Sequence, residues 1–78
     1  MSRLLIVAGT YAQAMDRAAS LGLEPREWVY ASHPDALRGW LPSRIEYCGT
    51  YRYRRDWYEL QDELQVMESR MTWAGRKR

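Results

Sequence analysis

Two identical tripeptides are the part of the sequence best suited to ligand chemistry. Gly9-Thr10-Tyr11 and Gly49-Thr50-Tyr51 each follow a short run that ends in a small residue. Glycine lets a ligand approach the backbone closely, threonine supplies a hydroxyl, and a helix N-terminus presents free N–H groups to an anion. The repeated pattern therefore predicts a candidate site for a phosphate-bearing small ligand, such as a nucleotide, between the two Gly-Thr-Tyr loops.

The same tripeptides have a plainer interpretation as punctuation between a strand and a helix, with Gly making the turn and Thr capping the helix. The sequence contains neither Gly-x-Gly-x-x-Gly nor a P-loop, so it lacks the standard cradles for dinucleotides and triphosphates. The sequence leaves both interpretations open.

Ser32 and His33 lie between the two tripeptides in the chain and complete the set of candidate ligand-binding residues. With Asp35 they invite a catalytic interpretation, but triad partners converge through the fold, and immediate neighbours in sequence rarely point together. Asp35 is better explained as a helix-capping acid and His33 as a loop residue before proline. Because no acid–base pair or nucleophile–base pair can be named, the sequence favours a protein that is not an enzyme.

A basic and aromatic segment, residues 51–55, continues the second tripeptide and reads Tyr-Arg-Tyr-Arg-Arg. Interleaved rings and guanidinium groups suit base stacking combined with phosphate pairing. They equally suit tyrosines packed under a helix with arginines in water, or a hot spot for a partner protein. The candidate contacts for nucleic acid or a partner protein are Arg52, Tyr53, Arg54 and Arg55.

Composition excludes several classes of protein. One Cys and one His are too few for a disulfide framework or a protein-only structural zinc site, and we expect no metal and no cofactor. The longest apolar run, Leu4–Ala8, is far too short to span a membrane, and we expect no signal segment. These features predict a cytoplasmic protein without membrane contact, in which Cys48 is a small apolar strand residue.

Three short runs predict the strands that position these residues. Residues 3–8 are apolar on both faces of a strand, which indicates a central strand covered on both sides. Residues 27–31 predict a second strand. Residues 44–48 alternate apolar and polar side chains, as an edge strand with one wet face does.

The first helix is predicted directly after the first tripeptide. Thr10 and Gln13 form a Thr-x-x-Gln capping box, and Gly22 is a natural residue to end the helix. The expected apolar stripe toward the sheet consists of Ala12, Met15, Ala18 and Ala19.

Two further helices follow the second and third strands. Ser32–Asp35 is a helix-start pattern, and Gly39 ends what can be only one or two turns. Asp56 and Glu59 resemble a capping box that opens a last helix reaching about Thr72.

The order of these elements is β-α-β-(short α)-β-α, which favours parallel strands with right-handed connections. The apolar first strand belongs in the middle and the alternating third strand at an edge. The sequence thus predicts an α/β fold with a three-stranded parallel sheet of strand order 2-1-3, a minimal half of a doubly wound (Rossmann-like) fold. We assign residues 1–74 to this single domain and residues 75–78 to a basic C-terminal end. In such sheets ligands bind beyond the carboxyl ends of the strands, where both tripeptides lie.

The last predicted helix carries an apolar seam formed by Trp57, Leu60, Leu64, Met67 and Met71. A helix of about seventeen residues is about 25 Å long, whereas a strand of about six residues spans about 20 Å. Met67, Met71 and Trp73 should therefore overhang the sheet. Because a domain this small also buries a modest core, we expect a homodimer with Met67 and Met71 as its self-association contacts.

Composition also indicates the type of genome. The chain has eleven arginines, one lysine and no phenylalanine, which favours a high-GC source and weakens any functional meaning of arginine by itself. The formal net charge of +2 is too small to imply nucleic acid on its own.

Three motifs together carry a resemblance to known proteins. They are Gly9–Tyr11, the segment Tyr30–Gly39 that ends in Leu-Arg-Gly, and Gly49–Tyr51. In these motifs, over about residues 4–65, the chain resembles short uncharacterised α/β proteins of actinobacteriophages, which have no established activity. The Leu-Arg-Gly segment is also similar to the stretch before the acidic strand of P-loop ATPases such as terminases. This sequence departs there, because Cys48-Gly49-Thr50 stands where an acidic pair is needed.

The leading expectation is a small non-catalytic, phage-type binding protein that contacts a host or viral macromolecule, first of all a protein, through the carboxyl ends of its strands. If the chain is virus-encoded, the host bacterial cytoplasm is its expected location. One alternative is the phosphate-bearing ligand between the two Gly-Thr-Tyr loops. The second alternative is nucleic-acid binding by residues 51–55 and the basic tail.

Overall fold

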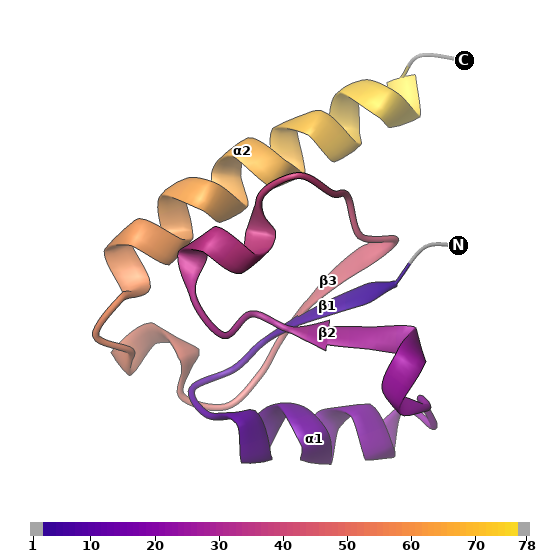
Figure 1. The fold of residues 1–78 in the computed structure, drawn as a ribbon, viewed down its shortest axis with the longest axis vertical. Coiled ribbons are helices and arrows are strands. Elements are labelled where there is room, and N and C mark those ends of the chain that lie inside the picture. Colours follow the sequence, from indigo (N-terminus) through magenta and orange to yellow (C-terminus); the bar gives the residue numbers. More distant parts are fainter. Residues whose placement is uncertain (1–2, 77–78) are drawn as a thin grey trace.

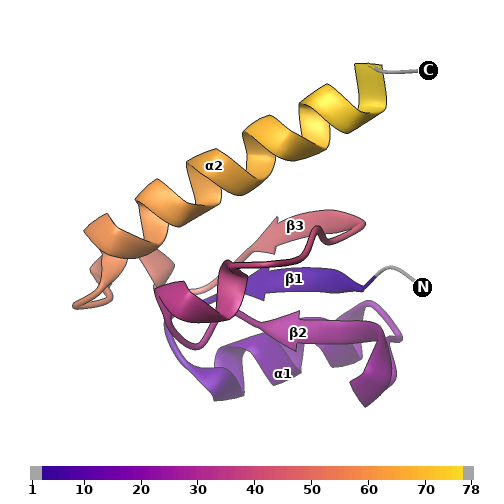
Figure 2. The ribbon, with the colours of Figure 1, turned by 45° about the horizontal axis from the view of Figure 1, so that its top comes forward.

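The computed structural model describes the backbone of residues 3–76 and the side chains of residues 3–71. Its centre is a three-stranded parallel sheet of β1 (Leu4–Val7), β2 (Trp28–Tyr30) and β3 (Arg44–Tyr47), in the order β2-β1-β3. Helix α1 (Tyr11–Ser20) covers one face of the sheet and helix α2 (Trp57–Arg76) covers the other (Figure 2). This architecture confirms the predicted small α/β fold with strand order 2-1-3.

Three short 3₁₀ turns complete the connections: η1 (Pro25–Glu27), η2 (Pro34–Leu37) and η3 (Tyr51–Tyr53). Each strand is shorter than its predicted run by one or two residues. The short helix predicted after β2 is the single 3₁₀ turn η2, which has proline in its first turn. Turns η2 and η3 follow the carboxyl ends of β2 and β3, the end of the sheet where the sequence predicts a site.

Strand β1 is buried on both faces, as its sequence predicts. Leu5 and Val7 point to the α2 side, where they pack with Leu60, Leu64 and Met67. The α1 side holds Leu4, Ile6, Ala8, Ala14, Ala18 and Cys48. A strand that contributes side chains to two separate cores must be central, because only a central strand has a neighbour on both edges and cover on both faces.

The predicted stripe of α1 is confirmed at Ala18 and wrong at Ala12, Met15 and Ala19. Ala14 and Ala18 are the buried positions, whereas Met15 is 49% exposed and Ala12 and Ala19 face solvent. The reason is steric: α1 lies close to the sheet, and only alanine is small enough for the surface between them. The larger Met15 therefore lies at the margin of the helix.

Helix α2 packs along the sheet further than predicted. Leu60, Leu64 and Met67 are buried, and Trp57 and Met71 are partly buried against the same cluster. The connection 38–43 runs alongside α2 (Figure 1) and extends the apolar surface beneath it with Trp40. The expected overhang at Met67 is therefore wrong, because Met67 is 3% exposed within one copy of the chain.

Two further expectations concern the end of α2. The helix continues to Arg76, through Gly75, instead of ending near Thr72. The side chain of Trp73 lies outside the described residues. Self-association remains a prediction, now without Met67 as a contact. None of the helices between residues 3 and 76 combines the length and the apolarity needed to cross a membrane.

Candidate functional site

The carboxyl ends of the three strands lead into loops that lie at one edge of the sheet. These loops, residues 9–11, 31–34 and 49–55, form what we call the strand-end face (Figure 1). It contains every residue predicted to bind a ligand or partner: Gly9, Thr10, Tyr11, Ser32, His33, Gly49, Thr50, Tyr51, Arg52, Tyr53, Arg54 and Arg55. The fold thus brings the two tripeptides together at this face.

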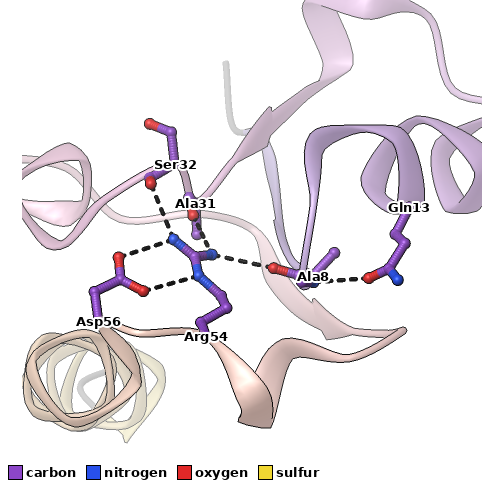
Figure 3. Close-up of polar contacts among 7 residues, drawn as sticks. Ala8, Gln13, Ala31, Ser32, Arg54 and Asp56 are labelled. Carbon is purple, nitrogen blue, oxygen red and sulfur yellow. Dashed lines mark hydrogen bonds and ion pairs between the residues drawn. The ribbon is translucent and has the colours of Figure 1, made fainter.

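Gln13 fills the space between the two tripeptides. Its side-chain carbonyl Oε1 accepts hydrogen bonds from the backbone N–H of Gly9 at 2.9 Å and of Thr50 at 3.0 Å. Thr50 Oγ1 lies 3.3 Å from the same oxygen, and Gln13 Nε2 donates to Thr50 Oγ1 at 3.2 Å. One amide side chain from α1 therefore joins the two Gly-Thr loops, as Figure 3 shows for its contact beside Ala8.

The glycines of the tripeptides are explained by this contact. A Cβ atom on Gly9 would overlap Thr50 Oγ1 and lie 2.8 Å from Gln13 Oε1. A Cβ atom on Gly49 would overlap Gln13 Oε1, and Gly49 also has a φ of +65° that favours glycine. The absence of side chains at both positions makes room for Gln13 rather than for an external ligand.

The predicted capping box is formed only in part. Thr10 caps α1, because its hydroxyl accepts a hydrogen bond from Gln13 N at 3.1 Å. The Gln13 side chain does not return to the Thr10 amide and binds Gly9 and Thr50 instead. Two of the amides between the tripeptides, those of Gly9 and Thr50, are thus already paired within the chain.

Arg54 joins the strand ends on the other side of the face (Figure 3). Its Nη1 donates to the carbonyl oxygens of Ala8 at 3.1 Å and Ala31 at 2.6 Å, and its Nη2 donates to Ser32 O at 2.9 Å. Its Nε and Nη2 also form a fork with both carboxylate oxygens of Asp56 at 3.0 Å. The side chain of Arg54 is only 7% exposed. Arg54 is therefore a structural residue that ties β1, β2 and the start of α2 together.

This arrangement changes two expectations. Arg54 was a candidate contact for nucleic acid or a partner protein, but all five of its hydrogen bonds are internal. Asp56 was expected to open a capping box with Glu59, but its carboxylate turns toward Arg54. Both changes have one cause: the carbonyl oxygens at parallel strand ends need donors, and a buried guanidinium supplies several at once.

The outer surface of the face is formed by exposed tyrosines and arginines. Tyr53 is 87% exposed, and Arg52 and Arg55 on the same loop are exposed beside it. Tyr58, on the first turn of α2, is 82% exposed. Tyrosines this open bury little surface within the fold, so their rings are accessible to a partner.

Tyr51 belongs to the interior side of the same loop. Its ring packs against Tyr47 at 5.2 Å and Trp57 at 5.3 Å between centroids, and the Arg52 guanidinium lies 5.6 Å above it. The hydroxyl of Tyr47 donates to Glu68 at 2.6 Å. Burial and the negative charge of Glu68 raise the pKa of Tyr47. This cluster anchors η3 to α2 and holds the exposed part of the loop in place.

Residues with catalytic potential are not gathered on the face. The side chains of Ser32 and His33 are exposed, and neither side chain forms a hydrogen bond within residues 3–71; Arg54 binds only the backbone carbonyl of Ser32. Cys48 is buried, and burial raises the pKa of its thiol, which makes it a poor nucleophile. Within the described chain, no three His, Cys, Asp or Glu side chains are placed to hold a metal ion.

A large open depression of about 1140 Å³ lies at the opposite end of the sheet. Its lining includes Arg3, Leu23 and Ser43, with Glu24 and Arg26 paired at its rim. Its size does not make it the better candidate site, because it lies away from the strand carboxyl ends where ligands bind in such sheets.

Two residues that organise the face, Gln13 and Arg54, have roles that the sequence does not indicate. Gln13 binds a loop 37 residues away, and nothing local distinguishes Arg54 from Arg52 or Arg55. No protein-family model, curated protein or solved structure matches the chain. The candidate site therefore rests on the geometry described above.

Proposed function

We propose that this chain is a non-catalytic binding module that contacts a macromolecule through the strand-end face. The observation that carries the proposal is a contrast within that face. Its inward polar groups are paired by Gln13 and Arg54, whereas Tyr53 on its outer surface is 87% exposed between two arginines. Such a face presents exposed side chains to an external partner, while the Gly9 and Thr50 amides between its loops are occupied by Gln13.

Two physical features support a role in binding. Tyrosine and arginine are the residues most enriched among those that dominate binding energy, because each combines a large contact area with polar groups. The loop that carries them is also held rigidly, by the Arg54 hydrogen bonds on one side and the Tyr51 ring contacts on the other. A rigid loop loses little conformational entropy when a partner binds.

The small phosphate-bearing ligand is the weaker alternative, because it would have to displace Gln13 from two backbone amides. With the resemblance to actinobacteriophage proteins, we propose a host or viral macromolecule as the partner. The proposed phage origin depends on the resemblance, and the proposed macromolecular partner depends on the exposed side chains.

The test is capture from an actinobacterial lysate with the immobilised chain, identified by mass spectrometry and by nucleic-acid staining, with and without nuclease. A Tyr53→Ser, Arg55→Ser variant removes the exposed ring and charge. A Leu21→Ser, Arg26→Ser variant is the matched control, because both residues are exposed at the opposite end of the sheet.

We expect material that the natural chain and the control both retain and that the Tyr53, Arg55 variant loses. Circular dichroism must show that all three are equally folded. Material retained equally by all three proteins, or none at all, would overturn the proposal.

A further inference from the structure

The strand-end face has an asymmetric charge. Its three loops contain three arginines and one histidine but no Asp or Glu. Arg54 is neutralised by Asp56 just outside the face. Elsewhere on the described surface, Arg17, Arg26, Arg38 and Arg44 each pair with a carboxylate, whereas the single arginines Arg3 and Arg70 do not. Arg52 and Arg55 form no ion pair with any described residue, so their charges attract an anionic partner.

The exposed large side chains of this face are aromatic. Tyr53 and Tyr11 are 87% and 57% exposed, and Tyr58, on the first turn of α2, is 82% exposed. The exposed aliphatic side chains lie on α1 or its end, in the connection after η2 and on α2: Met15, Leu21, Leu41 and Val66. Among the exposed large apolar side chains of the described residues, those beside Tyr53 are therefore rings and not aliphatic groups.

Unpaired arginines that alternate with open tyrosine rings suit a partner that carries both phosphates and flat rings. Every base offers a ring face for stacking, and guanidinium groups pair with the phosphates between bases. In a duplex the bases already stack on each other, so their faces are not open to Tyr53. Only an unpaired strand can use both kinds of side chain at once.

We infer that the macromolecule bound by this face is single-stranded nucleic acid, with bases stacked on Tyr53 and Tyr58 and phosphates paired with Arg52 and Arg55. The inference rests on the proposed function and names the class of partner. It assigns Arg54 no contact, because that guanidinium is held inside the face.

The experiment is a fluorescence anisotropy titration of a labelled 12-residue oligothymidylate with the purified chain, repeated from 20 to 200 mM salt. Two phosphate contacts predict a slope of log affinity against log salt of about −1.4, taking about −0.7 per contact for a single strand. A 12-base-pair duplex is the comparison, and we expect it to bind at least about ten-fold more weakly.

The variants separate stacking from charge. Tyr53→Leu keeps an apolar side chain of similar size but removes the ring, and we expect affinity to fall about 5-fold or more. Tyr53→Phe keeps the ring, and its affinity should stay within about two-fold of the natural chain. Arg52→Gln with Arg55→Gln should weaken binding and move the salt slope toward zero. Arg26→Gln with Arg44→Gln, at the opposite end of the sheet, is the control and should change neither quantity.

Three results would overturn the inference: no binding at 20 mM salt, equal affinity for duplex and single strand, or equal loss for Tyr53→Leu and Tyr53→Phe. The proposed binding function does not depend on the partner being single-stranded nucleic acid. If the lysate experiment still yields a nuclease-resistant partner that depends on Tyr53, the face binds a protein and only the inference fails. If that experiment also fails, both are overturned.

Discussion

The two Gly-Thr-Tyr tripeptides have the same sequence and different structures. Thr10 has extended backbone angles, φ −140° and ψ 162°, and its hydroxyl caps a helix of ten residues. Thr50 has φ −97° and ψ 36°, caps nothing, and is followed by a single 3₁₀ turn. Tyr11 lies against Trp28 and Tyr30 on the α1 side, whereas Tyr51 lies against Tyr47 and Trp57 on the α2 side.

The difference shows that a repeated motif need not be a repeated site. The first tripeptide starts a helix because alanine and glutamine follow it, and Gln13 then binds both loops. The second tripeptide is followed by arginines and tyrosine, and its helix starts at Trp57, six residues after Tyr51 and directly after the Arg54–Asp56 pair. One loop is held by a threonine cap and the other by a guanidinium. Four comparisons between variants test this difference.

The largest expected effect is that of Arg54→Ala. Removing a guanidinium that is 7% exposed leaves strand-end carbonyls and the Asp56 carboxylate without their partner. Losing one member of a buried pair typically lowers the free energy of unfolding by about 3–5 kcal/mol. Urea denaturation followed by circular dichroism measures this, and a chain already unfolded without urea also meets the expectation.

Arg55→Ala is the matched control for Arg54→Ala, because Arg55 is the neighbouring, exposed arginine. It should change the free energy of unfolding by no more than about 0.5 kcal/mol. Equal effects of the two substitutions would contradict the structural role of Arg54.

The next largest effect is that of Gly49→Ala, compared with Gly22→Ala. Both glycines have positive φ, +65° and +72°, so both substitutions carry the left-handed penalty of about 1–2 kcal/mol. A Cβ atom on Gly22 meets nothing within 4 Å, whereas one on Gly49 displaces Gln13. Gly49→Ala should therefore lower the free energy of unfolding by about 1–2 kcal/mol more than Gly22→Ala, the value of the displaced hydrogen bonds.

A double-mutant cycle sharpens this comparison. In a Gln13→Ala background the side chain that Gly49→Ala displaces is absent, so the two glycine substitutions should become nearly equal. A difference that persists without Gln13 would show that Gly49 is required for another reason.

A smaller difference in the free energy of unfolding is expected between substitutions of the two threonines. Thr10→Ala removes a helix cap and should lower the free energy of unfolding by about 1 kcal/mol. Thr50→Ala removes a hydroxyl contact but leaves the Thr50 amide bound to Gln13, so its effect should be about half as large or less. Denaturation midpoints of the two variants under identical conditions give the order. The reverse order would mean that the second loop, not the first, depends on its threonine.

The smallest expected effect is a pH dependence of the stability contributed by Tyr47, which packs against the second tripeptide. Burial and Glu68 raise the pKa of Tyr47 above its ordinary value of about 10. The folded chain then holds a proton that the unfolded chain releases, so the stability gained from this group is complete below pH 10 and is lost as the pH rises above it. Tyr47→Phe should show a shallower loss of stability between pH 10 and 11 than the natural chain. Equal slopes would mean that Tyr47 titrates normally in the folded state.

The architecture was largely predictable because it follows from burial patterns. Four consecutive apolar residues in β1 require cover on both faces, and the alternation in β3 requires an edge position. The phase of α1 was not predictable from apolar character alone, because distance from the sheet selects alanine over methionine there.

The location of the candidate site was predictable from the sequence, but the contacts within it were not. Strand order locates the strand-end face, and the tyrosines and arginines on it follow from the sequence. The pairing of Gln13 with Thr50 depends on bringing α1 and β3 together, which no local pattern encodes. Which of three arginines turns inward depends equally on the path of the loop.

The parallel sheet also determines when the chain can fold during synthesis. Leu4 pairs with Trp28 and with Arg44, so even the nearer partner is 24 residues away, and no strand pair is joined by a hairpin. The α2 side of β1 is covered only when Leu60, Leu64 and Met67 have been made. At about 5–20 residues per second, the interval from Tyr47 to Met67 lasts about 1–4 s. During that interval on the ribosome, Leu5 and Val7 are open to chaperones and to other nascent chains.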